Sequence, residues 1–227
     1  MPVLSHLDVP PELQRNAPRV RKLGADHTGE VLIRHATRCC GLESLAQCDL
    51  LDVGCGVRFT SALINRGIPF KSYTGIEVHR PIVDFLKSHV EALDARFRFA
   101  HWDVRNDRYH LAGQRMAEQT TLPLPGEFDV AWLFSVFTHL DPADSAAMLR
   151  LVRDRIRDTG RLMFSAFLDE RVDGFSDAVA GSPLLRAVYH PALMQELVTQ
   201  AGWRLLDRHA ADPEHFVQAA IVCAPAA

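Results

Sequence analysis

Short apolar runs alternate along most of the chain with segments in which apolar residues recur every three or four positions. The first pattern predicts buried strands and the second predicts amphipathic helices. We expect strands at about 48–53, 72–77, 97–102, 128–134, 161–167, 203–208 and 216–223. We expect helices at about 28–41, 59–66, 81–93, 143–157 and 191–201. Strands that alternate with helices are typical of a parallel sheet with helices on both faces.

The segments outside this alternation divide the chain. Residues 1–46 contain an arm that is rich in Pro and Arg at its start, followed by a helix. We expect this arm and helix to pack on or near the active site. Residues 47–227 form the main domain, with long irregular insertions near 105–127 and 169–190. Such segments in compact domains are often lids or binding loops. The last two strands are separated only by a short turn at 212–214, which predicts an antiparallel pair.

Composition narrows the class of protein. The chain is 48% hydrophobic and 23% charged, with a formal net charge of −3, so it is expected to fold and lacks a broadly basic surface for nucleic acid. Its start does not resemble a signal peptide and no apolar run is long enough to span a membrane, so we expect a cytoplasmic protein. The five cysteines include no C-x-x-C pair, so we expect neither disulfides nor a structural metal.

A glycine turn follows the first predicted strand. The apolar run from Leu50 reaches Asp52, and Gly54 and Gly56 then stand one residue apart before a helical pattern. Glycine lets a ligand approach the backbone closely, and the helix that follows points free N–H groups towards it. A dinucleotide site of the G-x-G-x-x-G type is disfavoured because Phe59 stands at the third glycine position. A tight turn without a ligand is the remaining alternative.

Three acidic residues stand near the ends of the first three predicted strands. Asp52, Glu77 and Asp103 are separated by about one strand–helix unit each. Ligands of open α/β sheets bind at the carboxyl ends of the strands, so these carboxylates are expected to line one edge of a site. A weakly acidic pocket favours a positively charged ligand.

The turn Asp52-x-Gly54-x-Gly56 resembles motif I of the class I S-adenosylmethionine (SAM)-dependent methyltransferases. Many members carry a third glycine where this chain has Arg58. The resemblance implies a three-layer, Rossmann-like α/β fold whose mostly parallel, seven-stranded sheet has a reversed C-terminal strand. It also implies SAM as cofactor and S-adenosylhomocysteine as product. Cys55, inside the turn, would then be a cofactor-binding residue.

The same resemblance assigns roles to the other acidic residues. Glu77 matches the motif II acid that accepts hydrogen bonds from the ribose hydroxyls. Asp103 matches the motif III acid that accepts from the adenine amino group, with Trp102 or Val104 packed on the ring. Asp52 is expected to order the glycine turn or to meet the amino acid end of the cofactor through water. Arg58 would meet a carboxylate of the cofactor or of the protein.

The stretch Ser-Val-Phe-Thr-His-Leu after the fourth predicted strand resembles motif IV of small-molecule and sugar methyltransferases. Phe134 and Ser135 would face the methionine part of the cofactor. His139 is the first candidate for a base that removes a proton from the acceptor, and His190 is the second, because imidazole titrates near neutral pH. The alternative for His139 is a structural histidine that bonds a backbone carbonyl. Further candidates for acceptor contact are Tyr109, His110 and Tyr189.

We therefore expect methyl transfer from SAM to a small molecule, most simply to a hydroxyl of a sugar, glycolipid or secondary metabolite. Four alternatives remain: an N-methyltransferase of a small amine, a SAM-binding module without activity, an NAD-dependent oxidoreductase, and a methyltransferase of protein or nucleic acid. The absence of basic character argues against nucleic acid. Whether the chain forms a homodimer is open.

Overall fold

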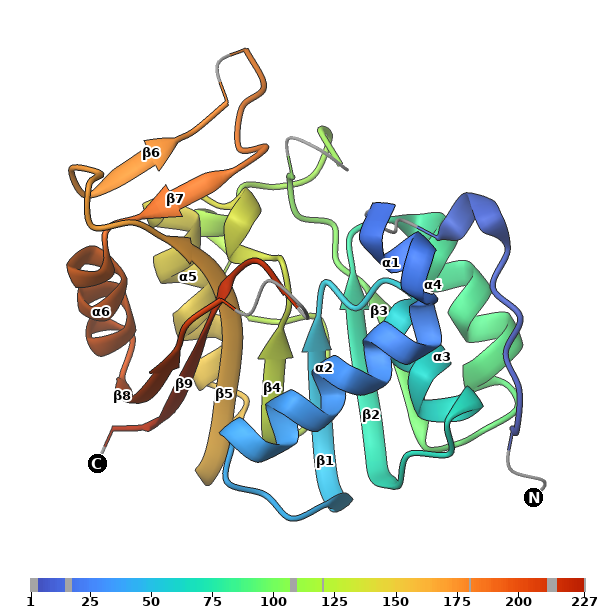
Figure 1. Ribbon diagram of the computed structural model, residues 1–227. Coiled ribbons are helices and arrows are strands. Elements are labelled where there is room, and N and C mark those ends of the chain that lie inside the picture. The colour runs from blue at the N-terminus through green and yellow to red at the C-terminus, as the bar shows by residue number, and fades with distance from the viewer. Residues whose placement is uncertain are drawn as a thin grey trace.

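A mixed sheet runs through the protein, with helices on both faces (Figure 1). The computed structural model describes residues 4–14, 18–106, 110–119, 121–179, 181–211 and 216–226. The strands in this part of the chain are β1 Leu45–Val53, β2 Phe70–Glu77, β3 Phe97–His101, β4 Phe128–Leu133, β5 Ile156–Leu168, β6 Phe175–Asp177, β7 Ala187–Tyr189, β8 Trp203–His209 and β9 Ala219–Pro225. The helices are α1 Pro18–Leu23, α2 Ala25–Cys39, α3 Arg58–Asn65, α4 Arg80–Leu86, α5 Pro142–Arg153 and α6 Pro191–Gln200.

Most neighbouring strands in the central part of the sheet are parallel. Strands β3, β2, β1, β4 and β5 lie side by side and pair in parallel. Strand β9 pairs antiparallel with β5 on one side and with β8 on the other. These seven strands confirm the expected Rossmann-like sheet with its reversed C-terminal strand. The turn at 212–214 lies outside the described residues.

Two short strands in the segment 169–190 extend this sheet. Strand β7 pairs in parallel with the end of β5, and β6 pairs antiparallel with β7, which brings the sheet to nine strands among the described residues. The β6–β7 hairpin projects beyond the carboxyl end of β5 (Figure 1). The sequence pattern did not predict these two strands.

Alternation along the strands divides the apolar side chains between two cores. Leu51 and Val53 of β1 point to the face covered by α5 and α6, whereas Leu50 points to the face covered by α2, α3 and α4. Each face buries its own cluster of side chains, with Trp203 in the first and Trp132 in the second. Because both faces are buried, apolar residues follow one another without alternation in parts of the central strands, such as 50–51 in β1 and 130–133 in β4.

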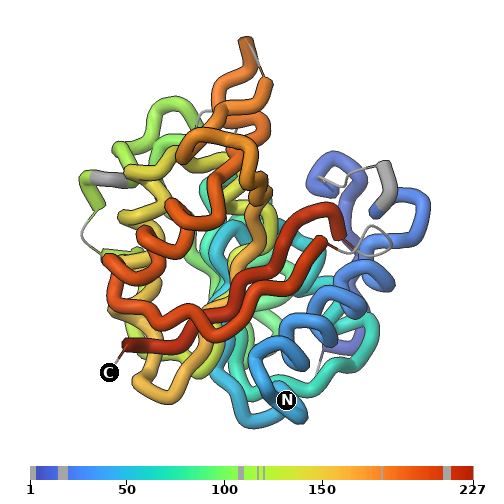
Figure 2. The backbone as a smooth tube through the Cα atoms, turned by 60° about the vertical axis from the view of Figure 1, so that its left-hand side comes forward, coloured from blue at the N-terminus to red at the C-terminus, as the bar shows by residue number. Residues whose placement is uncertain are grey.

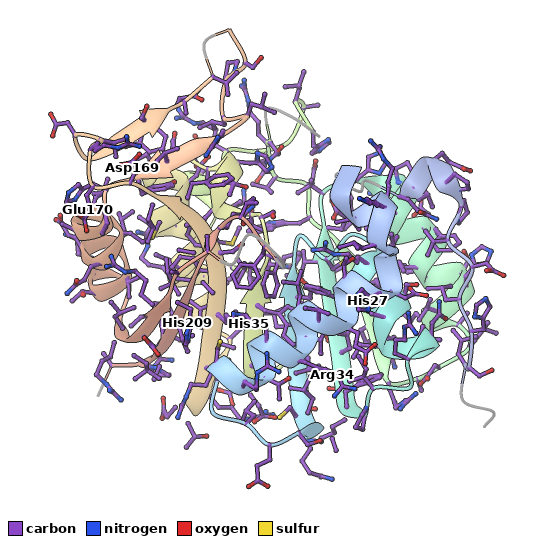
Figure 3. All side chains as sticks on the ribbon, viewed as in Figure 1. His27, Arg34, His35, Asp169, Glu170 and His209 are labelled. Carbon is purple, nitrogen blue, oxygen red and sulfur yellow. The ribbon has the colours of Figure 1, made fainter. Side chains whose placement is uncertain are left out.

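Helices α2 and α3 cross closely beside the glycine turn. A Cβ built on Gly29 of α2 would lie 2.7 Å from Ala62 Cβ and 3.0 Å from the carbonyl oxygen of Arg58. At its other end α2 lies beside the C-terminal strands (Figure 2), where His35 packs 5.8 Å from His209 between ring centres (Figure 3). Helix α2 therefore packs against α3 near one of its ends and against β8 near the other.

Several helix and strand boundaries in the structure differ from those expected from the sequence. The helix expected at 81–93 ends as α4 at Leu86 and continues as a π-helical turn, Lys87–Glu91. Strand β5 begins at Ile156 rather than at 161, so Gly160 lies within the strand. Asp141 caps the start of α5, because its side chain accepts from the backbone N–H of Asp144 at 2.8 Å. In the described part of the chain, no helix has both the length and the apolar character needed to cross a membrane.

Candidate active site

The glycine turn between β1 and α3 bends back over the end of β2. Gly54 and Gly56 have φ values of +73° and +50°, in the left-handed region that side chains with a Cβ disfavour. The backbone N–H groups of Gly54 and Cys55 both donate to the carbonyl oxygen of Ile76, at 2.8 and 3.1 Å. A Cβ on Gly56 would meet no atom within 4 Å, so the space beside the turn is open.

Glu77, the last residue of β2, is buried against this turn. One of its carboxylate oxygens, Oε2, accepts from the backbone N–H of Gly56 at 3.0 Å. The other, Oε1, accepts from the backbone N–H of His79, also at 3.0 Å. Each carboxylate oxygen has a further lone pair. The carboxylate is therefore fixed in place while it keeps capacity to accept hydrogen bonds from a ligand.

A hollow of about 290 Å³ lies at the carboxyl ends of β1, β2 and β4. Its lining brings together most of the side chains that the sequence predicted as site residues: Gly54, Cys55, Gly56, Arg58, Glu77, Trp102, Val104, Phe134, Ser135 and His139. It also includes residues that the sequence analysis missed: Leu13, Val20, Val53, Val57, Ile76, Val78, Ile82, Arg105, Asn106, Met116, Val136, Leu140 and Met148. The hollow is thus mainly apolar, with one fixed carboxylate.

Asp52 lies beneath the hollow rather than in its lining. It is buried, and the hydroxyl of Tyr73 donates to its Oδ2 at 2.5 Å. Burial raises the pKa of Asp52 to about 7, although the hydrogen bond from Tyr73 acts in the opposite direction. In the structure this side chain is therefore bonded to β2 through Tyr73 and takes no part in the lining of the hollow.

Asp103 and His190 also lie outside the lining. The Asp103 side chain is exposed, and His110 Nε2 lies 2.6 Å from its Oδ1. This hydrogen bond lowers the pKa of Asp103. His190 is the N-cap residue of α6, where its Nδ1 accepts from the backbone N–H of Ala192 at 3.1 Å. The structure therefore does not bring His190 together with His139 at the hollow.

Arg58 begins α3 and contributes to the wall of the hollow. Burial lowers the pKa of its guanidinium, while the nearby carboxylate of Asp52 partly offsets the shift. Its Cζ lies 5.4 Å from the centre of the Phe59 ring. Within the described residues, its guanidinium makes no ion pair of 4 Å or less. This cation could meet an anionic group of a ligand.

Ser135, just after β4, is held in a left-handed conformation with φ of +59°. Its backbone N–H donates to Ser165 Oγ at 2.8 Å, and Ser165 Oγ donates to Gln218 Oε1 at 2.5 Å. Gln218 Nε2 donates to Ser135 Oγ at 2.9 Å, which closes the triangle. Three segments, after β4, within β5 and before β9, are joined here. Strain of this kind persists only where the surroundings enforce it.

A second hollow of about 290 Å³ adjoins the first and shares part of its lining, including His139 and Met116. Its other walls carry charged side chains from the segment after β3 and the start of α5, among them Arg115 and Asp141. His139 therefore stands where the two hollows meet. His139 Nδ1 also lies 2.9 Å from the carbonyl oxygen of Leu184.

Three further residues were candidates for contact with the acceptor: Tyr189, His110 and Tyr109. Tyr189 is buried and its hydroxyl donates to the carbonyl oxygen of Leu140 at 2.5 Å, so it is bonded to the loop after β4 and lies outside the lining of both hollows. His110 is engaged with Asp103, and Tyr109 lies outside the described residues. Among the described residues, no group of three or more His, Cys, Asp or Glu side chains is placed to hold a metal ion.

Comparison with known structures gives the same fold. Magnesium protoporphyrin IX methyltransferase from Synechocystis PCC 6803, solved with bound SAM, is 13% identical, with a TM-score of 0.57 over 98% of this chain and 88% of that one. A glycopeptide N-methyltransferase in complex with sinefungin is 14% identical, with a TM-score of 0.61 over 90% and 88%. A SAM-dependent methyltransferase from Clostridium acetobutylicum ATCC 824 is 11% identical, with a TM-score of 0.60 over 92% and 95%.

The sequence itself matches a family as well. Residues 51–162 fit the model of a methyltransferase domain family, and this segment runs from β1 into β5. It includes the glycine turn, Glu77 and the loop that carries His139. The match shows a methyltransferase domain in this chain, and the fold around it is the one seen in the SAM-dependent methyltransferases above.

Proposed function

We propose that the protein transfers a methyl group from SAM to a hydroxyl of a small molecule, such as a sugar, a glycolipid or a secondary metabolite. The observation that carries this proposal is the position of His139 at the junction of the two hollows. One hollow has the glycine turn and Glu77 in its wall, and the other has polar and charged walls. A cofactor and a polar acceptor would thus meet beside an imidazole.

In this proposal the first hollow holds SAM. Glu77 accepts hydrogen bonds from the ribose hydroxyls with the lone pairs that Gly56 and His79 leave available. Trp102 and Val104 pack against the adenine. The adenine amino group donates to Asp103, whose Oδ1 is engaged with His110 while Oδ2 remains.

The opposite end of the first hollow would hold the amino acid part of SAM. Gly54, Cys55 and Gly56 let it approach the backbone, and Arg58 attracts its carboxylate. Phe134 and Ser135 line the wall from the β4 side. When bound, SAM supplies an activated methyl group, and the protein supplies alignment and exclusion of water.

His139 would act as the base. A backbone carbonyl only accepts hydrogen bonds, so the Nδ1 that faces the Leu184 carbonyl carries the proton. In the neutral ring Nε2 is then the basic nitrogen. Removal of the hydroxyl proton as the methyl transfers leaves the acceptor as a neutral ether. This role and the structural role of His139 require different nitrogens, so the two are compatible.

The segments around the site complete the proposal. The arm and helix of residues 1–46 contribute Leu13 and Val20 to the lining of the first hollow. The insertion near 105–127 contributes Met116, and the insertion near 169–190 contributes Leu184 to the second hollow. We assign these segments the role of covers over the main domain, residues 47–227.

A second candidate is methyl transfer to an amine. The similarity to a glycopeptide N-methyltransferase favours it, and Asp141 in the second hollow could attract a cationic amine. At neutral pH an alkyl amine must also lose a proton before it accepts a methyl group, so His139 would serve here too. The chemical nature of the methylated product separates the two candidates.

The test is an acceptor screen with methyl-labelled SAM against sugars, glycolipids, phenols and small amines. Mass spectrometry identifies the labelled product and the position of the methyl group. We expect O-methylation, with a rate at least ~100-fold lower for His139→Ala, because a positioned base commonly contributes that much. Binding of SAM without transfer to any acceptor of the panel would count against this substrate class, and a product labelled on nitrogen would favour the amine.

A further inference from the structure

The β6–β7 hairpin is hydrogen-bonded to the loop that carries His139. His139 Nδ1 lies 2.9 Å from the carbonyl oxygen of Leu184, in the segment between β6 and β7. The hydroxyl of Tyr189, in β7, donates to the carbonyl oxygen of Leu140 at 2.5 Å. Two adjacent residues of the loop are therefore held by one hairpin, which itself extends from the end of β5.

Leu184 has an unusual backbone. Its φ is +52°, in the left-handed region, which leucine disfavours because its Cβ approaches the backbone. Its backbone N–H donates to Asp177 Oδ2 at 2.8 Å, and its carbonyl oxygen accepts from His139. Hydrogen bonds on both sides of this residue hold the strained conformation, and strained residues of this kind are often found at functional sites.

These contacts form one chain of hydrogen bonds from the hairpin to the hollow. Asp177 fixes the N–H of Leu184, and this fixes the direction of the Leu184 carbonyl. The carbonyl then requires a proton on His139 Nδ1 and sets the plane of the ring. The identity of the protonated nitrogen in a histidine is set in this way by the partner of that nitrogen.

We infer that Asp177 is a positioning residue for His139. Through Leu184 it keeps the ring in the tautomer whose Nε2 can take a proton, so the β6–β7 hairpin prepares the base as well as covering the site. This inference rests on the proposed function, in which His139 takes the proton of the acceptor. Asp177 itself touches neither SAM nor the acceptor.

The test compares three variants in the full chain. Asp177→Ala removes the carboxylate that holds Leu184. Asp177→Asn keeps an oxygen that can accept the same N–H, so it should behave as a conservative rescue. Asp173→Ala removes a carboxylate of the same segment for which the structure gives no side-chain hydrogen bond to Leu184, so it serves as the matched control.

The first readout does not depend on activity. Long-range proton–nitrogen correlation spectra report which ring nitrogen of each histidine is protonated, and comparison with His139→Gln assigns the signals of His139. We expect protonated Nδ1 in the wild type, Asp177→Asn and Asp173→Ala, and a mixture of tautomers in Asp177→Ala. An unchanged His139 signal in folded Asp177→Ala would overturn the inference.

The second readout is kinetic, with an acceptor found in the screen. Asp177→Ala should lower kcat about tenfold or more, since a misplaced base loses part of a contribution that commonly exceeds ~100-fold. The affinity for SAM, measured by calorimetry, should not change, and Asp177→Asn should restore kcat. Equal kcat in Asp177→Ala and Asp173→Ala would overturn the inference. Failure of the wild type to bind SAM would instead overturn the proposed function, while the spectra would still test the effect of Asp177 on the ring.

Discussion

The backbone N–H of Gly56 donates a hydrogen bond of 3.0 Å to Oε2 of Glu77, which joins the glycine turn to the end of β2. The turn is a short connection in which two residues, Gly54 and Gly56, have positive φ. The bond holds the one carboxylate in the lining of the first hollow at a fixed distance from the turn. Ligand binding and the conformation of the turn are therefore expected to depend on the same two residues.

Substitution of the two glycines should separate stability from binding. Both Gly54→Ala and Gly56→Ala force a residue with a Cβ into positive φ, at a cost of about 1–2 kcal/mol. In Gly54→Ala the Cβ also lies 2.8 Å from Val136 Cγ2, whereas in Gly56→Ala it enters open space beside the turn. Thermal unfolding should show the larger loss for Gly54→Ala, and calorimetry should show weakened SAM binding for folded Gly56→Ala. Wild-type affinity of Gly56→Ala would mean that no ligand approaches the turn.

Asp52 should make stability depend on pH. Burial raises its pKa to about 7, far above the value of about 3.9 in an unfolded chain. Between about pH 4 and pH 7 the folded state holds a proton that the unfolded state has released, so this group lowers stability as pH rises. The loss is about 1.4 kcal/mol for each unit of pKa difference.

The variant Asp52→Asn removes this titration and keeps an oxygen for the hydroxyl of Tyr73. We expect Asp52→Asn to be more stable than the wild type at pH 8 and similar to it near pH 4, as measured by chemical unfolding. The comparison is between the two proteins at each pH, so that other titrating groups cancel. A difference that does not grow with pH would show that the carboxyl is not buried as described.

The hydrogen-bonded triangle around Ser135 should contribute to both stability and binding. Gln218→Ala removes the partner of Ser135 Oγ and of Ser165 Oγ, and Ser165 is buried. The Ser165 hydroxyl would still accept from the N–H of Ser135, but its own buried O–H would lose its acceptor, at a cost of about 1–3 kcal/mol. The control is Gln200→Ala, whose exposed side chain donates to the exposed Glu196. We expect a lower Tm and weaker SAM binding for Gln218→Ala than for the control, and equal behaviour of the two would contradict the role of the triangle.

The central sheet was predictable because its strands are buried on both faces. Apolar runs such as 130–134 favour a buried strand between turn residues, and the alternation of strands and helices predicts a parallel sheet. Strands β6 and β7 were not predictable, since each has only three residues, which is too short to show a period. They form because β7 finds the free edge at the end of β5.

The site was predictable to the extent that it follows strand ends. Gly54, Glu77 and Ser135 reach the hollow because parallel strands present their carboxyl ends at one edge. Asp103 also follows a strand end, but its exposed side chain is bonded to His110 and lies outside the lining of the hollow. Leu13 and Met116 come from irregular segments, and no local pattern could show that they return to the hollow.

The most direct test of the account is calorimetric binding of SAM and of S-adenosylhomocysteine to the wild type and to Glu77→Ala. The control is Glu170→Ala, an exposed acidic residue beyond the end of β5 (Figure 3). We predict binding of both compounds to the wild type and the control. For folded Glu77→Ala we predict affinity about 10- to 100-fold lower, because hydrogen bonds to a charged group are worth about 1.5–3 kcal/mol. Absence of binding to the folded wild type, or equal affinity in Glu77→Ala, would contradict the assignment of this hollow as the SAM site.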